Sequence, residues 1–306
     1  MRGLVIKSTG SSYIVRMDDG SAVECHIKGN FRIRGIRSTN PVAVGDFVEV
    51  QTLADGTNWI VEIADRRNYI IRRSTNLSKE SHILAANIDQ VALIVTVNHP
   101  VTSTTFIDRF LATCEAYRVR AILIFNKVDL LTYEETERLN ELRALYESLD
   151  YSTLAICAKS GQLADTSGLL AGQTTLFSGN SGVGKSTLLN ALFGREMTRT
   201  GKISDAHDKG MHTTTFSEMY FLPDGGAVID TPGIKGFGTI DFEREEVSHY
   251  FREIFRVSRD CRFGNCTHTN EPGCAVQEAV VRGEIAVSRY ESYISLLGDC
   301  TESKYR

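Results

Sequence analysis

The residues best suited to chemistry in this chain form a glycine-rich loop in the middle of the sequence. "GNSGVGKST" places four residues between Gly179 and Gly184-Lys185-Ser186, which completes the phosphate-binding Walker A pattern. An apolar run enters the loop and an apolar helical stretch leaves it, so backbone N–H groups at a helix N-terminus can surround phosphate oxygens. Lys185 supplies a positive charge and Ser186 a hydroxyl for Mg²⁺, although a glycine-rich turn could mimic the pattern. The candidate nucleotide-binding residues here are Gly179, Asn180, Ser181, Gly182, Val183, Gly184, Lys185, Ser186 and Thr187.

A second polar motif, "NKVD", follows the apolar run "AILIF" and could read a nucleotide base. The Asp129 carboxylate can accept hydrogen bonds from N1–H and the exocyclic amine of guanine, whereas adenine lacks that amine, so Asp129 would select GTP over ATP. Asn126 would orient the loop and Lys127 would lie along the base. By itself, the motif could be an ordinary turn after a strand.

Two more loops follow apolar runs. "CAKSG" could contact the guanine oxygen through Ala158 and Lys159, and its distance from Asp129, about one helix and one strand, would bring both strand ends to the same edge of a sheet. "DTPG" closes the run "GAVI", so Asp230 could hold Mg²⁺ and Gly233 could sense a γ-phosphate. "CAKSG" is a weak signal alone, but with the other motifs the two loops complete a nucleotide site.

The segment "HTTT" offers hydroxyl groups where a mobile loop should bring a threonine to Mg²⁺. The sequence leaves open which of Thr213, Thr214 and Thr215 does so, with Thr214 as the working choice, and a run of threonines can also be a strand edge. The order of the motifs is base loop, second base loop, phosphate loop, threonines and Mg²⁺ aspartate. Because a site built from strand ends depends on their positions in space, we interpret this order as a circularly permuted GTPase domain.

A cluster of cysteines and one histidine near the C-terminus has the spacing of a metal site. In "CRFGNCTHTNEPGC", four residues separate Cys261 from Cys266, one separates Cys266 from His268, and five separate His268 from Cys274. Three thiolates and an imidazole form a tetrahedral set for Zn²⁺ with no open position for catalysis. We predict one structural zinc ion that stabilises a region too small to bury its own core. The alternative is a group of free buried cysteines.

The helices and strands that position these residues are predicted from the apolar patterns of the sequence, which change along the chain. Short alternating runs broken by Gly, Asp and Asn, including "FRIRGI" at 31–36, predict a small antiparallel barrel at the N-terminus. The polar, basic segment 66–82 is interpreted as a linker. Near-continuous apolar runs then alternate with helical stretches, which predicts a mostly parallel sheet buried on both faces. One charged helix is expected over 132–150, with its leucines on one face: Leu139, Leu142, Leu145 and Leu149.

The chain is therefore expected to fold as an α/β protein with three domains. These are a β-barrel with its linker (1–68), the nucleotide-binding domain (69–238) and a helical zinc-binding domain (239–306). The net charge is −4, so any contact with nucleic acid must come from a local basic patch. No apolar run approaches the roughly 20 residues of a membrane span. A secretory signal is also not evident, so we expect a soluble, cytoplasmic protein that contacts no membrane.

Together, these motifs closely resemble the ribosome small subunit-dependent GTPase A family. The stretches that carry the resemblance are "ANIDQ", "NKVDL", "GNSGVGKSTLLN", "GMHTTT", "DTPGIKGFG" and "CTHTNEPGCAV". The resemblance implies an N-terminal OB-fold, a permuted GTPase domain and a zinc domain that act in late maturation of the small ribosomal subunit. It also implies that the subunit stimulates GTP hydrolysis and that the GTP state controls binding to its rRNA; we expect a monomer. One departure is Met211, which stands where we expect a basic residue.

The barrel offers a basic face of its own. On a strand, Arg32 and Arg34, with Lys28 in phase, would face away from Phe31 and Ile33. Such a face suits an RNA backbone, but charge on an exposed strand is also usual without any partner.

The water-activating group is the least defined part of the predicted site. Many GTPases have a glutamine directly after the glycine of "DxxG", but this chain has Ile234 there, which offers no polar group. His212 is the nearest candidate, and the alternative is that the ribosome supplies or positions the missing group. Two other functions remain open: an assembly factor that uses GTP only as a conformational lock, and a metabolic P-loop enzyme. The barrel and the structural zinc argue against the metabolic enzyme.

Overall fold

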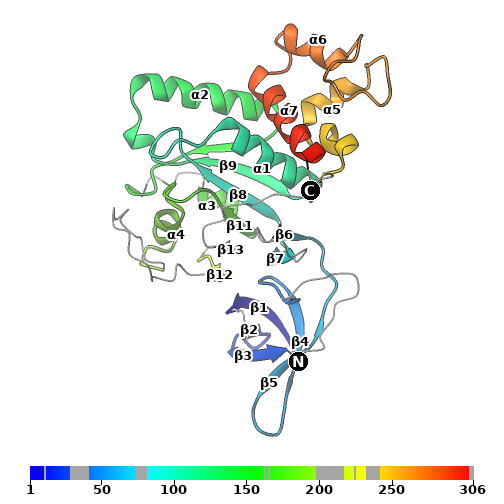
Figure 1. Ribbon diagram of the computed structural model, residues 1–306. Helices are drawn as coiled ribbons and strands as arrows, with labels where there is room; N and C mark the ends of the chain where they lie inside the picture. Colours follow the sequence, from blue (N-terminus) through cyan, green and yellow to red (C-terminus); the bar gives the residue numbers. More distant parts are fainter. Residues whose placement is uncertain are drawn as a thin grey trace.

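The computed structural model describes residues 1–9, 12–27, 41–73, 81–161, 163, 166–197, 217–223, 225–231 and 242–302. Figure 1 shows an N-terminal barrel at the bottom, a central sheet with helices in the middle, and a C-terminal group of helices at the top. Among the described residues, every helix is too short or too polar to cross a membrane.

The N-terminal part is a five-stranded barrel, as its alternating sequence predicts. The strands lie in the order β1-β2-β3-β5-β4, and β4 pairs back with β1, which closes the barrel. Alternate residues such as Val5, Val15 and Ile60 fill its core. The strand β5 was not expected, and the expected strand at 31–36 lies outside the described residues. The bounds are β1 Arg2–Ser8, β2 Tyr13–Met17, β3 Ala22–Ile27, β4 Phe47–Thr52 and β5 Asn58–Ile63.

The segment interpreted as a linker is partly a β-hairpin. Strand β6 (Tyr69–Arg73) pairs antiparallel with β7 (Ser81–Ala86), and the two form a sheet of their own. The prediction of a plain linker was therefore wrong here. The physical reason is that Ile70 is fully buried and packs into the core of the following domain, although most of its neighbours in the sequence are polar.

The central sheet contains five parallel strands and one antiparallel edge strand, in the order β10-β9-β8-β11-β13-β12. Every residue of β8 is buried, in agreement with the prediction from its continuous apolar run. Strand β12 also pairs with β1, through Lys7 and Glu218, so the barrel extends the edge of this sheet. The bounds are β8 Gln90–Val95, β9 Arg120–Phe125, β10 Ser152–Ala155, β11 Thr174–Ser178, β12 Glu218–Phe221 and β13 Ala227–Asp230.

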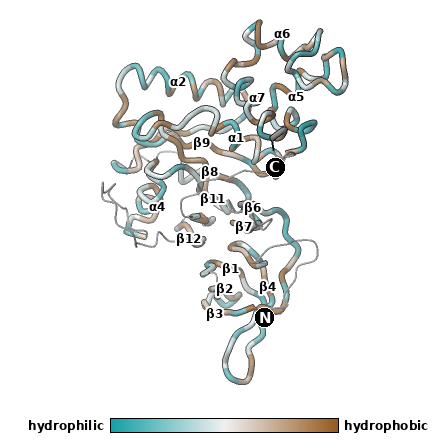
Figure 2. Tube along the Cα trace, in the orientation of Figure 1, coloured by the Kyte–Doolittle hydropathy of each residue, from teal (hydrophilic) through white to brown (hydrophobic). Residues whose placement is uncertain are grey.

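Helices cover both faces of this sheet. On one face, α1 and α2 pack against the odd-numbered residues of β8, and on the other face α3 and α4 pack against its even-numbered residues. Figure 2 shows that apolar segments gather along these central strands. In α2, Leu139 and Leu142 are buried as predicted, but the fully buried side chain of the next turn is Tyr146, while Leu145 and Leu149 are half-buried. The bounds are α1 Thr104–Ala116, α2 Tyr133–Ser148, α3 Thr166–Leu170, α4 Lys185–Phe193 and the 3-10 helix η1 Val128–Leu130.

The C-terminal part is helical, as predicted. Phe251, Ile254, Val276 and Tyr293 form a core of their own, which also includes Ala112 from α1. Helix α7 packs against α1, so this region rests on the central domain. The bounds are η2 Arg244–Tyr250, α5 Arg252–Ser258, α6 Ala275–Val281 and α7 Val287–Glu302.

Candidate nucleotide site and metal centre

The glycine-rich loop lies between the end of β11 and the start of α4, where the sequence predicts it. At two positions of this loop, both the backbone conformation and the lack of room for a side chain require glycine. A Cβ on Gly179 (φ +146°) would lie 2.2 Å from the carbonyl oxygen of Ile94, and a Cβ on Gly184 (φ +98°) would lie 2.3 Å from Asn126 Nδ2. No side chain fits at these distances, so the loop can pack against β8 and β9 only with glycine at both positions.

The side chain of Lys185 is folded over this loop. Its Nζ donates to the carbonyl oxygens of Gly179 (2.7 Å) and Asn180 (2.9 Å). Partial burial lowers the pKa of Lys185, and the Asp230 carboxylate opposes that shift. Ser181 and Gly182 are exposed, Val183 is buried in the core, and Ser186 and Thr187 lie half-buried in the first turn of α4. The loop therefore exposes its tip and holds a cation above it.

Asn126 connects three loops that are far apart in the sequence. It follows β9 and is 4% exposed. Its Nδ2 donates to the carbonyl oxygen of Val183 in the glycine-rich loop (2.9 Å), and its Oδ1 accepts from the backbone N–H of Ala158 (3.0 Å). Buried polar atoms cost free energy unless they are hydrogen-bonded, so both bonds fix the relative positions of these loops.

Lys127 and Asp129 follow Asn126 in the loop after β9, at the carboxyl edge of the central sheet. Lys127 has a left-handed backbone (φ +65°), and its Nζ donates to the carbonyl oxygen of His99 (2.6 Å). Asp129 is exposed in η1, and Lys159 is exposed one residue after Ala158. The contact with His99 was not predicted. Its segment follows β8 at the same sheet edge, so the rule that strand ends gather there is the signal that could have found it.

Asp230 is the last residue of β13, directly beside the strand that leads into the glycine-rich loop. Partial burial raises the pKa of Asp230, while the positive charge of the Lys185 ammonium opposes that shift. The Asp230 carboxylate and the Ser186 hydroxyl are oxygen donors of the kind that Mg²⁺ prefers. The predicted residues His212, Thr213, Thr214, Thr215 and Gly233 lie outside the described part of the chain.

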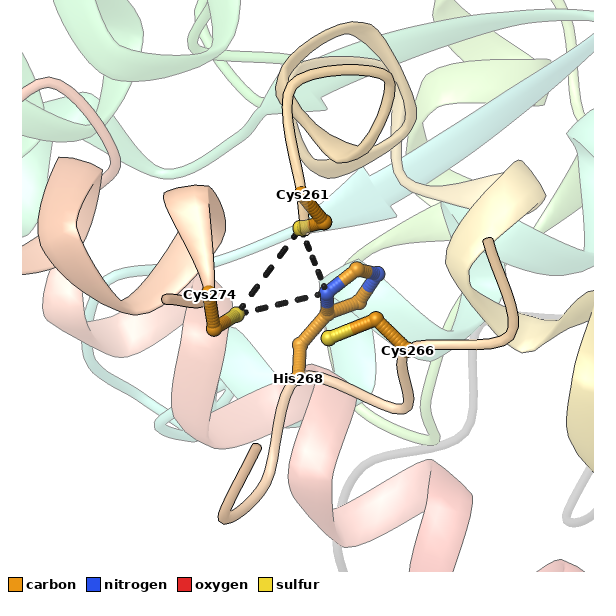
Figure 3. Close-up of side chains that lie close together, drawn as sticks. All are labelled: Cys261, Cys266, His268 and Cys274. Carbon is orange, nitrogen blue, oxygen red and sulfur yellow. Dashed lines mark hydrogen bonds between the residues drawn. The ribbon is translucent and has the colours of Figure 1, made fainter. Parts of the chain in front are cut away.

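The four predicted metal ligands lie together, as Figure 3 shows. Cys261, Cys266, His268 and Cys274 place their ligand atoms within 4.8 Å of one another. His268 Nδ1 lies 3.6 Å from Cys261 Sγ and 3.5 Å from Cys274 Sγ, and these two sulfur atoms are 4.0 Å apart. Ligands of one tetrahedral zinc ion would be about 3.4 to 3.8 Å apart. The separations among Cys261, His268 and Cys274 are close to this range, and Cys266 lies near enough to be the fourth ligand.

Hydrogen bonds from neighbouring helices hold the ligand loop in place. The Tyr290 hydroxyl donates to the carbonyl oxygen of His268 (2.7 Å), and the Tyr293 hydroxyl donates to that of Thr267 (2.7 Å). The backbone N–H of Gln277 donates to Cys274 Sγ (3.5 Å). These contacts tie the cluster to α6 and α7, so a metal ion at this position would hold the ligand loop and both helices together.

Comparison with known proteins gives the family. A family model described as RsgA GTPase matches residues 63–240, and one described as RsgA N-terminal domain matches residues 2–60. The "Small ribosomal subunit biogenesis GTPase RsgA 2" of Bacteroides thetaiotaomicron is 60% identical over 307 residues, which cover 100% of this chain and 99% of the relative. The "Small ribosomal subunit biogenesis GTPase RsgA" of Porphyromonas gingivalis is 58% identical over 312 residues, with the same coverage.

Solved structures agree with the sequence comparisons. The crystal structure of YjeQ from Thermotoga maritima matches with a TM-score of 0.77 and 33% identity, covering 98% of each chain. The structure of "YloQ, a circularly permuted GTPase" matches with a TM-score of 0.72 and 29% identity, covering 100% of this chain and 96% of that one. The fold is thus a circularly permuted P-loop GTPase domain between an OB-like barrel and a helical region with a Cys and His cluster, and the chain belongs to the RsgA GTPase family.

Proposed function

We propose that this chain binds GTP at the carboxyl edge of its central sheet, hydrolyses it, and acts in late maturation of the small ribosomal subunit. The observation that carries the proposal is the Asn126 side chain, whose two partners, Val183 and Ala158, are 57 and 32 residues away in the sequence. One buried amide thus joins the phosphate loop and both base loops. This arrangement supports a single nucleotide site despite the exchanged order of the motifs.

Base recognition is assigned to residues of the two loops that Asn126 connects after β9 and β10. Asp129 would accept the N1–H and exocyclic amine of guanine, and Lys127 would lie along the base. Ala158 and Lys159 would contact the guanine oxygen. The exposure of Asp129 supports this role, because its carboxylate is accessible to a ligand. Adenine would leave that carboxylate without a donor, so GTP is favoured over ATP.

Phosphate binding is assigned to residues 179–187. When phosphates bind, the Lys185 ammonium would exchange the carbonyl oxygens of its own loop for phosphate oxygens. Ser186 and Asp230, with Thr214 from outside the described residues, would hold Mg²⁺. A bound Mg²⁺ supplies charge neutralisation for the phosphate oxygens. Gly233 would sense the γ-phosphate, and His212 would hold the attacking water.

The metal proposed at Cys261, Cys266, His268 and Cys274 is one structural zinc ion. Three sulfur ligands and one nitrogen ligand favour zinc over the oxygen-seeking ions. The cluster stands among helices and offers no further described ligand atom, which supports a structural role.

The proposed partner is the small ribosomal subunit with its rRNA, which fits the names of the relatives. The basic residues Lys28, Arg32 and Arg34 of the barrel are assigned to RNA phosphates and lie outside the described residues. GTP would favour the bound state and GDP the released state. We expect the protein to act in the cytoplasm as a monomer.

The test is GTP turnover by the purified chain with and without small ribosomal subunits. We expect slow hydrolysis by the chain alone and a large increase with subunits, and Lys185→Ala should be inactive in both conditions. If the chain bound both GTP and subunits but subunits left turnover unchanged, the nucleotide would act only as a conformational lock, and the proposed hydrolytic cycle would be wrong.

A further inference from the structure

The loop between β8 and α1 (residues 96–103) is a closed, ordered structure. The backbone N–H of Thr102 donates to the carbonyl oxygen of Thr96 (3.1 Å), and the N–H of Thr96 donates to the Thr102 hydroxyl (3.2 Å). The Thr96 hydroxyl donates to the carbonyl oxygen of Pro100 (2.5 Å). Thr96 and Thr102 are both buried. These bonds close the base of the loop, so its tip has a defined position.

The tip of the β8–α1 loop contacts both halves of the nucleotide site. The carbonyl oxygen of His99 accepts from Lys127 Nζ at 2.6 Å. Pro100 lies beside the glycine-rich loop, where its Cδ is 3.6 Å from the position of a Cβ on Gly182. The β8–α1 loop therefore contacts both the base-reading motif and the phosphate-binding motif, although neither motif is part of it.

The outer side of the same tip is held by α2. Asn98 Nδ2 donates to Glu135 Oε1 (2.5 Å), and Asn98 Oδ1 accepts from the backbone N–H of His99 (2.9 Å). Glu135 Oε2 accepts from the N–H of Thr132, which closes the capping box at the start of α2. One carboxylate therefore fixes both the start of the helix and, through Asn98, the backbone at His99.

Lysine needs such support more than most residues do. Its ammonium is a compact charge on a flexible four-carbon stem, so holding it in one place costs side-chain entropy. A fixed acceptor orders the lysine side chain before the ligand binds, so less side-chain entropy is lost during binding. The His99 carbonyl is that acceptor, and Asn98 and Glu135 determine where it lies.

We propose that Asn98 and Glu135 are positioning residues for the guanine nucleotide, which they affect by holding the His99 carbonyl that orients Lys127. The inference rests on the proposed function of the site and adds a third loop to it. The alternative is a purely structural role, in which Asn98 only attaches the β8–α1 loop to α2 and does not affect the nucleotide. The two roles differ in what they change: a positioning residue alters nucleotide binding through Lys127, whereas a fastening alters the stability of the fold.

The test is a double-mutant cycle on GDP dissociation, measured by displacement of a fluorescent GDP from the full chain. We expect Asn98→Ala to raise the dissociation rate about tenfold in the wild-type background. In the Lys127→Ala background, the same substitution should change the rate less than about twofold, because its route to the nucleotide is already lost. Asn140→Ala, at an exposed asparagine of α2, is the matched control and should leave the rate unchanged.

Equal effects of Asn98→Ala in both backgrounds would overturn the positioning role, and so would a lower melting temperature with an unchanged GDP dissociation rate. If the wild-type chain failed to bind GDP at all, the proposed function itself would be wrong. Wild-type GDP binding with no effect of Asn98→Ala would remove only the inference about this loop.

Discussion

The buried amide of Asn126 has both of its polar atoms engaged, one by the phosphate-binding loop and one by the loop at Ala158. The sequence predicts that this residue orients its loop, and the structure gives that role two named partners. This bridging role can be tested by replacing Asn126 with a residue of the same size that cannot make both hydrogen bonds.

Asn126→Asp is expected to destabilise the protein and weaken nucleotide binding. The new carboxylate could still accept from Ala158, but it cannot donate to Val183 and would place an acid beside a carbonyl oxygen. We expect the free energy of unfolding to fall by about 2 to 3 kcal/mol, with at least roughly tenfold weaker GDP binding. Chemical denaturation and GDP titration measure both. Asn140→Asp is the exposed control, and wild-type behaviour of Asn126→Asp would contradict the bridging role.

His212→Ala tests the proposed water-activating group. GTP binding should survive, while turnover stimulated by small subunits should fall by roughly 10² to 10⁴, the effect of losing a positioned acid or base. Single-turnover hydrolysis on saturating subunits is the measurement. A rate within about twofold of wild type, with intact binding, would mean that the water is oriented by another group.

Among helices, strands and loops, sequence patterns predicted those with a strong physical signature. The strands β8, β9, β11 and β13 are continuous apolar runs because both faces of the sheet are covered. The β6–β7 hairpin was not predicted, since only a few apolar residues within a polar segment anchor it. The β8–α1 loop was not recognised either, because its contacts with the nucleotide site are made by the backbone carbonyl of His99 and the ring of Pro100. Such contacts leave no pattern of side-chain types in the sequence.

Loss of one zinc ligand is expected to loosen the ligand loop and its flanking helices. Metal binding contributes directly to folding in small sites of this kind, so Cys266→Ser should lose bound zinc and the hydrogen-exchange protection of residues 261–281. Cys300→Ser is the matched control, because Cys300 lies in α7 outside the cluster. Metal analysis of chain purified without chelator measures the ion. The absence of zinc in wild type, or its retention in Cys266→Ser, would contradict the assignment.

At the scale of the whole molecule, the buried cation Arg289 joins the helical region to the GTPase domain. Arg289 of α7 is 1% exposed and donates to Asp108 of α1 (2.8 Å) and to Glu253 of α5 (2.6 Å). Tyr146 of α2 also donates to Asp108 (2.9 Å). Removal of a buried cation leaves its carboxylates without a counter-charge in a site that water does not reach, which is more costly than the loss of an exposed pair.

Arg289→Ala should therefore lower the free energy of unfolding by about 3 to 5 kcal/mol. The matched control is Arg282→Ala, which removes an exposed arginine paired with Glu278 and Glu284 and should leave the free energy of unfolding nearly unchanged. Equilibrium denaturation of both variants in zinc-containing buffer is the measurement. Equal effects of the two substitutions would show that the buried network does not hold these regions together.

At the scale of the whole molecule, we propose that loops whose order in the chain is exchanged meet at one sheet edge and form a guanine-specific site. The most direct measurement is the affinity of Asp129→Asn for GTP and for xanthosine triphosphate. We expect weaker binding of GTP and stronger binding of xanthosine triphosphate, because the new amide can donate to the xanthine 2-oxygen where the carboxylate cannot. Unchanged selectivity for GTP in this variant would contradict it.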